Sequence, residues 1–128
     1  MKLLLDTATF LWMYLGEKEH FSKKALHALE KSDVIYLSAV SSWEIAIKFS
    51  LGKLELKTPP QDWLLNTIQL MGIESLPVYH QHSLHVAELP WHHKDPFDRL
   101  LISQSIQENL TLLSPDSVFK KYPVELVW

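Results

Sequence analysis

Residues 2–16 read KLLLDTATFLWMYLG, and this stretch contains the pattern from which the fold can be inferred. Lys2 to Asp6 is a short apolar run that ends in an acid, which is typical of a buried parallel strand. Thr7 to Leu15 follows with its apolar residues at helical spacing, and Gly16 is a stop signal for that helix. The stretch therefore predicts a buried strand that leads directly into a helix, with Asp6 at the junction.

The same alternation of short strands and helices continues along the chain. Such alternation favours an α/β fold with a central, mainly parallel twisted sheet covered by helices on both faces, in one domain over residues 1–128. The expected strands after the first are Val34–Leu37, Ile73–Val78, Thr111–Ser114 and Val124–Val127. The expected helices are Lys23–Lys31, Ser41–Leu51, Gln61–Met71, His80–Leu89, Asp95–Glu108 and a short piece over Asp116–Tyr122.

Composition restricts the classes of function. The chain has no cysteine, which excludes disulfides, thiolate metal sites and cysteine nucleophiles. Its net charge of -3 argues against broad, nonspecific binding to a nucleic-acid backbone. The sequence shows neither a signal peptide nor a membrane span, so we expect a soluble, cytoplasmic protein.

Four acidic residues fall near the predicted ends of strands or the starts of helices: Asp6, Glu44, Asp98 and Asp116. In parallel sheets, ligands bind outside the carboxyl ends of the strands, and these positions can converge there. Converging carboxylates repel one another unless their pKa values rise or divalent cations bind. Hard cations such as Mg²⁺ and Mn²⁺ prefer oxygen ligands, so a shared metal site is one interpretation.

Helix capping is the alternative interpretation, and the sequence by itself does not decide between the two. Asp6 and Asp116 each precede a predicted helical segment and can cap it. Ser41 and Glu44 match a capping box. Asp95 is placed to cap the helix that follows it, because the next residue is proline.

The acids lie in four segments that together resemble the PIN-domain family, in particular its VapC-type toxins. Each segment is weak evidence alone, but the four occur in the family's order from one end of the chain to the other. They are LLLDTATFLW (3–12), SSWEIAIKFSLGKL (41–54), HHKDPFDRLLISQS (92–105) and LTLLSPDSVFKKYPV (110–124).

The resemblance implies a three-layer α/β/α fold and a Mg²⁺- or Mn²⁺-dependent endoribonuclease. Carried over by position, the catalytic and metal-binding acids are Asp6, Glu44, Asp98 and Asp116. Asp95 matches an extra acid of this branch and is a less secure ligand. In place of the family's more usual threonine–small–aspartate, this chain has Ser-Pro-Asp-Ser, which leaves the placement of Asp116 open because proline restricts the local backbone.

The same resemblance implies an RNA substrate, a cognate antitoxin that covers a groove among the early helices, and a homodimer. Arg99, Lys94 and Ser114 are candidates for contact with substrate phosphates. For most of the residues that are candidates for apolar contact with a partner, a place in the core is the favoured interpretation: Phe10, Trp12, Tyr14, Phe49 and Trp63.

Several other functions fit the sequence less well. A receiver-like phosphoacceptor needs an acid next to Asp6, where Thr7 stands, and a D-x-D phosphatase needs an acid at Ala8. Five histidines between residues 80 and 93 lack an HExxH pattern and accompanying cysteines, so we expect surface or partly buried imidazoles. A catalytically silent interaction module, in which the acids are only caps, is the main alternative to a nuclease.

Overall fold

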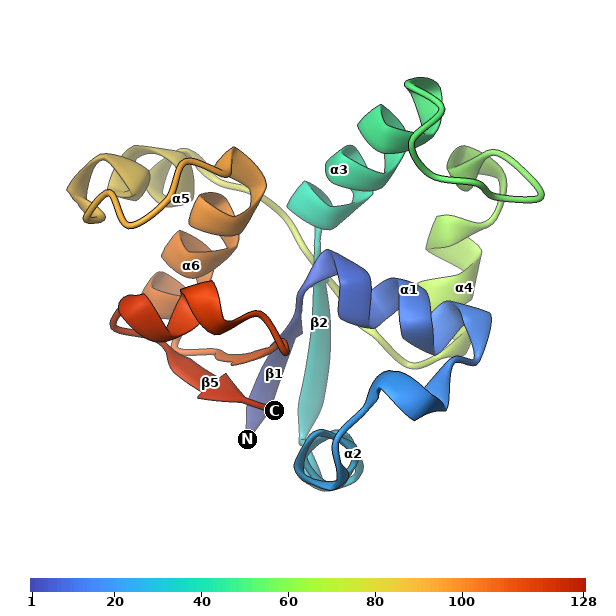
Figure 1. The fold of residues 1–128 in the computed structure, drawn as a ribbon, viewed down its shortest axis with the longest axis horizontal. Coiled ribbons are helices and arrows are strands. Elements are labelled where there is room, and N and C mark those ends of the chain that lie inside the picture. Colours follow the sequence, from blue (N-terminus) through green and yellow to red (C-terminus); the bar gives the residue numbers. More distant parts are fainter.

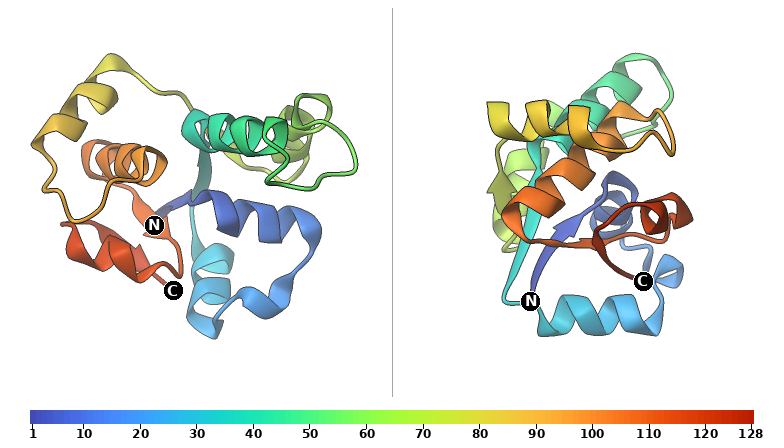
Figure 2. Two further views of the ribbon diagram at one scale, coloured as in Figure 1. Left: turned by 45° about the horizontal axis from the view of Figure 1, so that its top comes forward. Right: turned by 90° about the vertical axis from the view of Figure 1, so that its left-hand side faces the viewer.

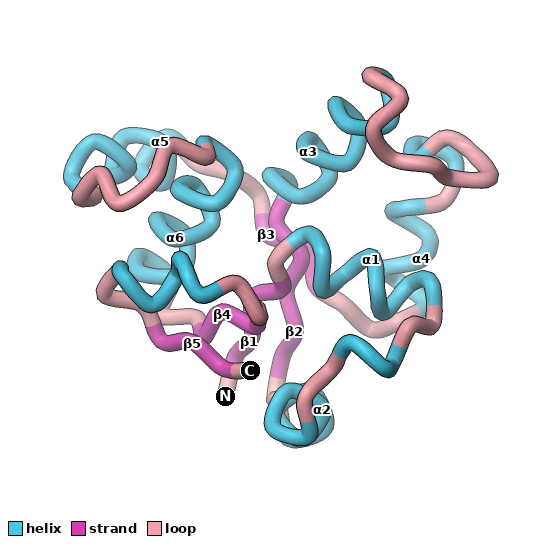
Figure 3. Tube along the Cα trace, in the orientation of Figure 1, coloured by secondary structure: helices cyan, strands magenta, loops and turns pink.

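The computed structural model describes all residues, 1–128, and contains a five-stranded sheet in which every neighbouring pair is parallel. The strand order is β3-β2-β1-β4-β5, so the first strand lies in the centre (Figure 1, Figure 3). The strands are β1 Lys2–Leu5, β2 Val34–Ser38, β3 Glu74–Leu76, β4 Thr111–Leu113 and β5 Glu125–Val127.

Alternate residues of the central strands bury their side chains on opposite faces of the sheet. Leu3 and Leu5 belong to one apolar cluster, and Leu4 belongs to another. In β4, Leu113 joins the first cluster and Leu112 the second. Because both faces are apolar, each needs a layer of helices to cover it, which produces the three-layer α/β/α arrangement that the sequence predicts.

The two apolar clusters show which helices cover which face. The first cluster draws on α1 Thr7–Leu15, α2 Lys23–Lys31, α3 Ala39–Ser50 and α4 Leu64–Leu70. The second draws on α6 Pro96–Glu108, on which α5 His80–His85 packs. Figures 1 and 2 show α5 and α6 grouped on one side of the strands, away from α1 and α4. Short 3₁₀ segments complete the chain: Lys18–His20, Pro60–Asp62, Val86–Glu88 and Ser117–Lys121.

The observed elements differ from the predicted ones in where α3 begins and in how two of the helices are divided. Helix α3 begins at Ala39 and not at Ser41, because the hydroxyl of Ser38 accepts a hydrogen bond from the Val40 N–H (3.0 Å) and caps the helix there. The two helices expected over 61–71 and 80–89 are each divided into a 3₁₀ segment and a shorter α-helix. None of the helices combines the length and apolar character needed to cross a membrane.

Candidate metal-binding acidic site

The register of the two central strands brings Asp6 next to Ser114. Leu5 of β1 pairs with Leu113 of β4, so the residues that follow them are also neighbours. The Ser114 hydroxyl donates to Asp6 Oδ2 (2.5 Å), while Asp6 Oδ1 accepts the Thr9 N–H (2.8 Å) and caps α1. Asp6 is therefore a helix cap and also part of the carboxyl edge of the sheet.

Asp116 lies two residues beyond Ser114 and caps the last 3₁₀ segment. Its backbone N–H donates to the Ser114 hydroxyl (3.1 Å), and its Oδ1 accepts the Val118 N–H (3.0 Å). Ser114 is buried and is thus bonded to both acids, which joins the ends of β1 and β4. The contact of Ser114 with a substrate phosphate stays a prediction.

Glu44 is nearly buried and is held by partners from two helices. The Thr7 hydroxyl at the start of α1 donates to Glu44 Oε1 (2.6 Å), and Lys48 Nζ bonds to Oε2 (2.5 Å). The capping-box interpretation is wrong, because Ser41 lies inside α3 and its hydroxyl lies 2.9 Å from the Thr7 hydroxyl, whose own proton goes to Glu44. Helix α3 therefore directs Glu44 from its second turn towards α1.

The start of α6 separates the roles of its two aspartates. Asp95 is exposed and caps the helix, with its Oδ1 accepting the Asp98 N–H (2.9 Å), and Pro96 occupies the first helical position. Asp98 projects from the first turn, with 23% of its side chain exposed, and its Oδ2 lies 3.2 Å from His93 Nε2. The cap predicted at Asp95 agrees with this geometry, and the role of Asp98 as a site residue stays a prediction.

The electrostatics of the site show that the acids lie within range of one another. Burial raises the pKa of Asp98 to about 7, assisted by the charges of the four other acids, Asp95, Glu44, Asp116 and Asp6. Burial likewise raises the pKa of Asp6, against hydrogen bonds from Ser114 and Thr9 that favour its charged form. The carboxyl edge of the sheet thus concentrates negative charge that the chain compensates only in part.

Lys48 is the cation of this chain that the structure places against the acids. Its hydrogen bond to Glu44 raises the pKa of its ammonium, and the charges of Asp95 and Asp98 act in the same direction. This one ammonium, half exposed to water, interacts with Glu44, Asp95 and Asp98, whereas five carboxylates repel one another at this edge. A divalent cation would relieve this imbalance.

The residues fit a hard divalent cation by chemistry and by charge. All donors are carboxylate or hydroxyl oxygens, which Mg²⁺ and Mn²⁺ prefer over nitrogen or sulfur. As arranged, no three His, Asp or Glu side chains are close enough to form a ready metal site. Binding would therefore require the carboxylates to draw together around the ion.

Arg99 does not have the role expected of it. Its side chain is 1% exposed, and its guanidinium donates to the carbonyl oxygens of Pro90 (2.7 Å), Val86 (3.2 Å) and Leu89 (3.2 Å). An arginine committed to buried carbonyls is not available to a substrate phosphate, so that expectation is wrong. Lys94 is exposed beside the acids and remains a candidate for phosphate contact.

Two residues of the site were missed in the sequence. Thr7 has a signal, since it directly follows Asp6 at the end of a strand, but its contact with Glu44 depends on the packing of α1 against α3. Nothing in the sequence distinguishes His93 as a site residue, because it is one of five histidines between residues 80 and 93, and others among them have different roles. His82, for instance, is fully buried and bonds through Nε2 to Glu108 (2.8 Å).

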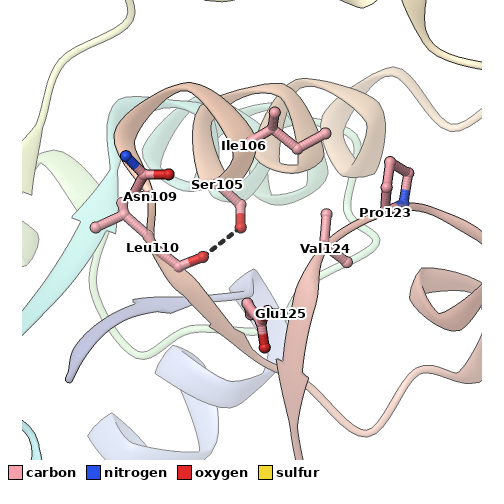
Figure 4. Close-up of a pocket in the computed structure, with 7 residues that line it drawn as sticks. All are labelled: Ser105, Ile106, Asn109, Leu110, Pro123, Val124 and Glu125. Carbon is pink, nitrogen blue, oxygen red and sulfur yellow. Dashed lines mark hydrogen bonds between the residues drawn. The ribbon is translucent and has the colours of Figure 1, made fainter.

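A cavity of about 490 Å³ lies at the opposite end of the sheet, among residues 105–110 and 123–125 (Figure 4). It adjoins the starts of β4 and β5, whereas the acids follow the strand ends. The polar contact drawn there is internal to the fold, with the Ser105 hydroxyl donating to the Leu110 carbonyl (2.6 Å). Glu125 is the one charged residue that lines it, so the cavity offers little of the chemistry found at the acids.

Comparison with known proteins agrees with the fold. A curated relative, ribonuclease VapC16 of Mycobacterium tuberculosis, is 41% identical over 51 residues, which cover 40% of this chain and 36% of the relative. The chain thus matches about a third of that relative's length.

Solved structures match nearly the whole chain at low identity. VapBC2 of Rickettsia felis, bound to a DNA fragment from its promoter, aligns with a TM-score of 0.73 and 22% identity over 98% of this chain and 97% of that one. DNA-bound VapBC of Salmonella typhimurium aligns with a TM-score of 0.70 and 14% identity over 98% and 96%. At these identities the matches establish the fold alone.

The family model described as the PIN domain matches residues 3–125, which include most of β1, all of β2, β3 and β4, all four predicted acids and the first residue of β5. The five-stranded parallel sheet and the helical layers agree with that match. This chain belongs to the PIN-domain family.

Proposed function

We propose that this protein is a divalent-metal-dependent endoribonuclease and the toxin of a toxin–antitoxin pair. The observation that carries the proposal is the convergence of Asp6, Glu44, Asp98 and Asp116 at one edge of the sheet, where burial and mutual repulsion raise the pKa of Asp98. Family membership and the similarity to ribonuclease VapC16 over 51 residues support it.

In this proposal Asp6, Asp98 and Asp116 hold a Mg²⁺ or Mn²⁺ ion, and Glu44 holds or orients a second ion or acts on the attacking water. Such a cation, when bound, makes a water molecule more acidic and offsets charge on the phosphodiester. Asp95 is a further candidate ligand, although its capping bond already accounts for its position.

The chain's own residues organise the site around that ion. The Thr7 hydroxyl and Lys48 Nζ hold the two oxygens of Glu44 and restrict its rotation. Ser114 holds one oxygen of Asp6, and the Thr9 N–H holds the other. Lys94, exposed at the start of α6, can meet a neighbouring phosphate of the RNA backbone.

The test is to sequence RNA ends after brief expression of the wild type and of Asp6→Asn. Asparagine keeps the acceptor that caps α1 while it removes the charge, so the fold should persist. We expect new, defined 5′ ends with the wild type and none with the variant. Identical cleavage profiles from both proteins would overturn the proposal.

A catalytically silent interaction module is the second candidate, because capping bonds alone account for Asp6, Asp95 and Asp116. Calorimetric titration of the purified protein with Mn²⁺ separates the two functions. The nuclease requires binding that Asp6→Asn weakens, whereas a silent module would bind no cation.

An antitoxin partner is part of the proposal. It is supported by an apolar cavity of about 300 Å³ between α3 and α4, lined by Ala46, Leu64 and the 72% exposed Leu65, among others. The similar structures from Rickettsia felis and Salmonella typhimurium are described as VapBC proteins bound to DNA. Phe10, one of the candidate contact residues, is fully buried in the first apolar cluster, so it belongs to the core and is not available to a partner.

We also propose a homodimer and a cytoplasmic location, where RNA substrates are available. Trp43 and Trp91 support the homodimer, since they are 54% and 72% exposed and line one apolar hollow near the acids. Light scattering on the purified protein measures the oligomeric state, and a mass of one chain at all concentrations would contradict the dimer.

A further inference from the structure

A chain of hydrogen bonds connects Asp98 to the interior of the protein through three residues that the proposed chemistry does not use. Arg99 Nη1 donates to the Tyr122 hydroxyl (3.2 Å), which lies 2.7 Å from His93 Nδ1. His93 Nε2 in turn lies 3.2 Å from Asp98 Oδ2. Arg99 and Tyr122 are buried, and only the His93–Asp98 end approaches solvent.

The positions of the protons in this series of hydrogen bonds can be assigned by counting donors and acceptors at the Tyr122 hydroxyl. Two groups that can only donate, Arg99 Nη1–H and the His93 backbone N–H (3.3 Å), point at that oxygen and occupy both of its lone pairs. The hydroxyl is left with its own proton to donate, and the acceptor within reach is His93 Nδ1. A proton on Nδ1 would instead face an oxygen with no acceptor capacity left.

Because Nδ1 accepts, the single proton of the neutral imidazole must be on Nε2. Nε2–H then donates to Asp98 Oδ2, while Asp98 Oδ1 accepts no hydrogen bond from any group in the chain. The histidine thus engages one oxygen of the carboxylate and leaves the other available.

The imidazole has little freedom to leave this position. The Arg99 guanidinium binds the carbonyls of Pro90, Leu89 and Val86 and so ties the segment that leads to His93 onto α6. The ring of Trp91 covers the guanidinium, with 3.8 Å between the ring centroid and Cζ. His93 is consequently held at its ring, at its backbone and through the preceding segment.

We infer that His93 is a positioning residue that acts as a neutral Nε2–H donor, orienting the Asp98 carboxylate so that its other oxygen is presented to the cation. The inference rests on the proposed function, since it concerns how that site is organised. It also explains why the single arginine of the chain is buried beside the acids without binding a carboxylate.

The first test reads the tautomer directly in the metal-free protein. Long-range proton–nitrogen NMR correlations of the imidazole distinguish a protonated from an unprotonated ring nitrogen. At neutral pH we expect His93 to carry its proton on Nε2 and to have an unprotonated Nδ1. A proton on Nδ1 in the wild type would overturn the inference, whatever the protein does to RNA.

The second test measures the affinity for Mn²⁺ by calorimetry in variants of His93. His93→Ala removes the donor, and loss of a residue that orients a metal ligand weakens binding by roughly 10-fold. His93→Gln places an amide N–H near the position of Nε2 and should restore most of that affinity. His92→Ala is the matched control, because the neighbouring exposed imidazole packs edge-on against the Tyr122 ring and makes no hydrogen bond.

Thermal unfolding of each variant separates positioning from a general loss of stability. Folded His93→Ala with the affinity of the wild type would overturn the inference, as would equal weakening in His92→Ala and His93→Ala. If the wild type itself binds no Mn²⁺, the proposed function fails instead, and the NMR result still decides the tautomer.

Discussion

The two ends of the parallel sheet differ in a way that locates the chemistry of this protein. At the amino end, near the starts of β4 and β5, there is a cavity of about 490 Å³ with one carboxylate at its lining. At the carboxyl end there are five carboxylates and the buried hydroxyls of Thr7, Ser41 and Ser114. The comparison teaches that concentrated, partly uncompensated charge marks the candidate site, whereas open volume does not.

The largest expected effect is on the rate of RNA cleavage, which should depend on the carboxylates at one end of the sheet and not on the carboxylate at the other. Asp98→Asn should reduce the rate of RNA cleavage by about a thousandfold, equivalent to about 4 kcal/mol of transition-state stabilisation. Glu125→Gln removes a carboxylate from the amino end and should leave the rate unchanged. Single-turnover cleavage of a defined RNA measures both, and a similar loss in the two variants would remove the distinction between the ends.

The next effect concerns cation binding and stability. Mn²⁺ at about 100 times its dissociation constant should add about 2.7 kcal/mol to the free energy of unfolding, because the ion binds the folded acids and not the unfolded chain. Urea denaturation with and without Mn²⁺ measures this difference. Glu125→Gln should gain as much as the wild type, and an equal gain in Asp6→Asn would place the bound ion elsewhere.

A smaller effect follows from the pKa of Asp98, which rises from 3.8 to about 7 in the folded protein. Between these values the folded state holds the extra proton, so the metal-free protein should lose stability as pH rises from about 4 to 7 and regain it as pH falls. Because the carboxyl is partly open to water, we expect on the order of 1–2 kcal/mol from this group. The difference between the wild type and Asp98→Asn in denaturation at several pH values isolates it, and a pH-independent difference would contradict the assignment.

The smallest effect distinguishes the two aspartates at the start of α6. Asp95→Ala removes the cap that accepts the Asp98 N–H and should cost about 1 kcal/mol of stability, with most of the cleavage rate retained. Denaturation and single-turnover kinetics measured side by side test this. A large loss of activity at unchanged stability would show that Asp95 acts on the cation or the substrate.

Much of the carboxyl end was predictable from local sequence. The positions of Asp6 and Asp98 follow from a strand that ends in an acid and from the Asp-Pro start of a helix, and both are local patterns. The contact of Glu44 with Lys48 follows from their i,i+4 spacing, but its contact with Thr7 was not predictable in this way. Its partners are Thr7, 37 positions earlier, and Lys48, and the interpretation of Ser41 as its capping partner was wrong because Ser38 starts the helix.

Arg99 shows most clearly where prediction from local sequence fails. An arginine beside two aspartates reads locally as a phosphate ligand, yet its guanidinium binds three backbone carbonyls and Tyr122. Those carbonyls belong to residues 86–90, which pack around Arg99 only in the folded chain. No pattern of residue spacing predicts these contacts, because every residue has a backbone carbonyl and its presence therefore does not mark a particular position.

The sequence by itself determined the alternation of strands and helices, the burial of the central strands on both faces and the acids that follow them, since these depend on periodicity and on residue type over short distances. Only the tertiary structure decided which groups share the site and in what state. The register of β1 with β4 brings Ser114 to Asp6. The packing of the segment before α6 brings His93 to Asp98, and it is the joint burial of the acids that raises the pKa of Asp98.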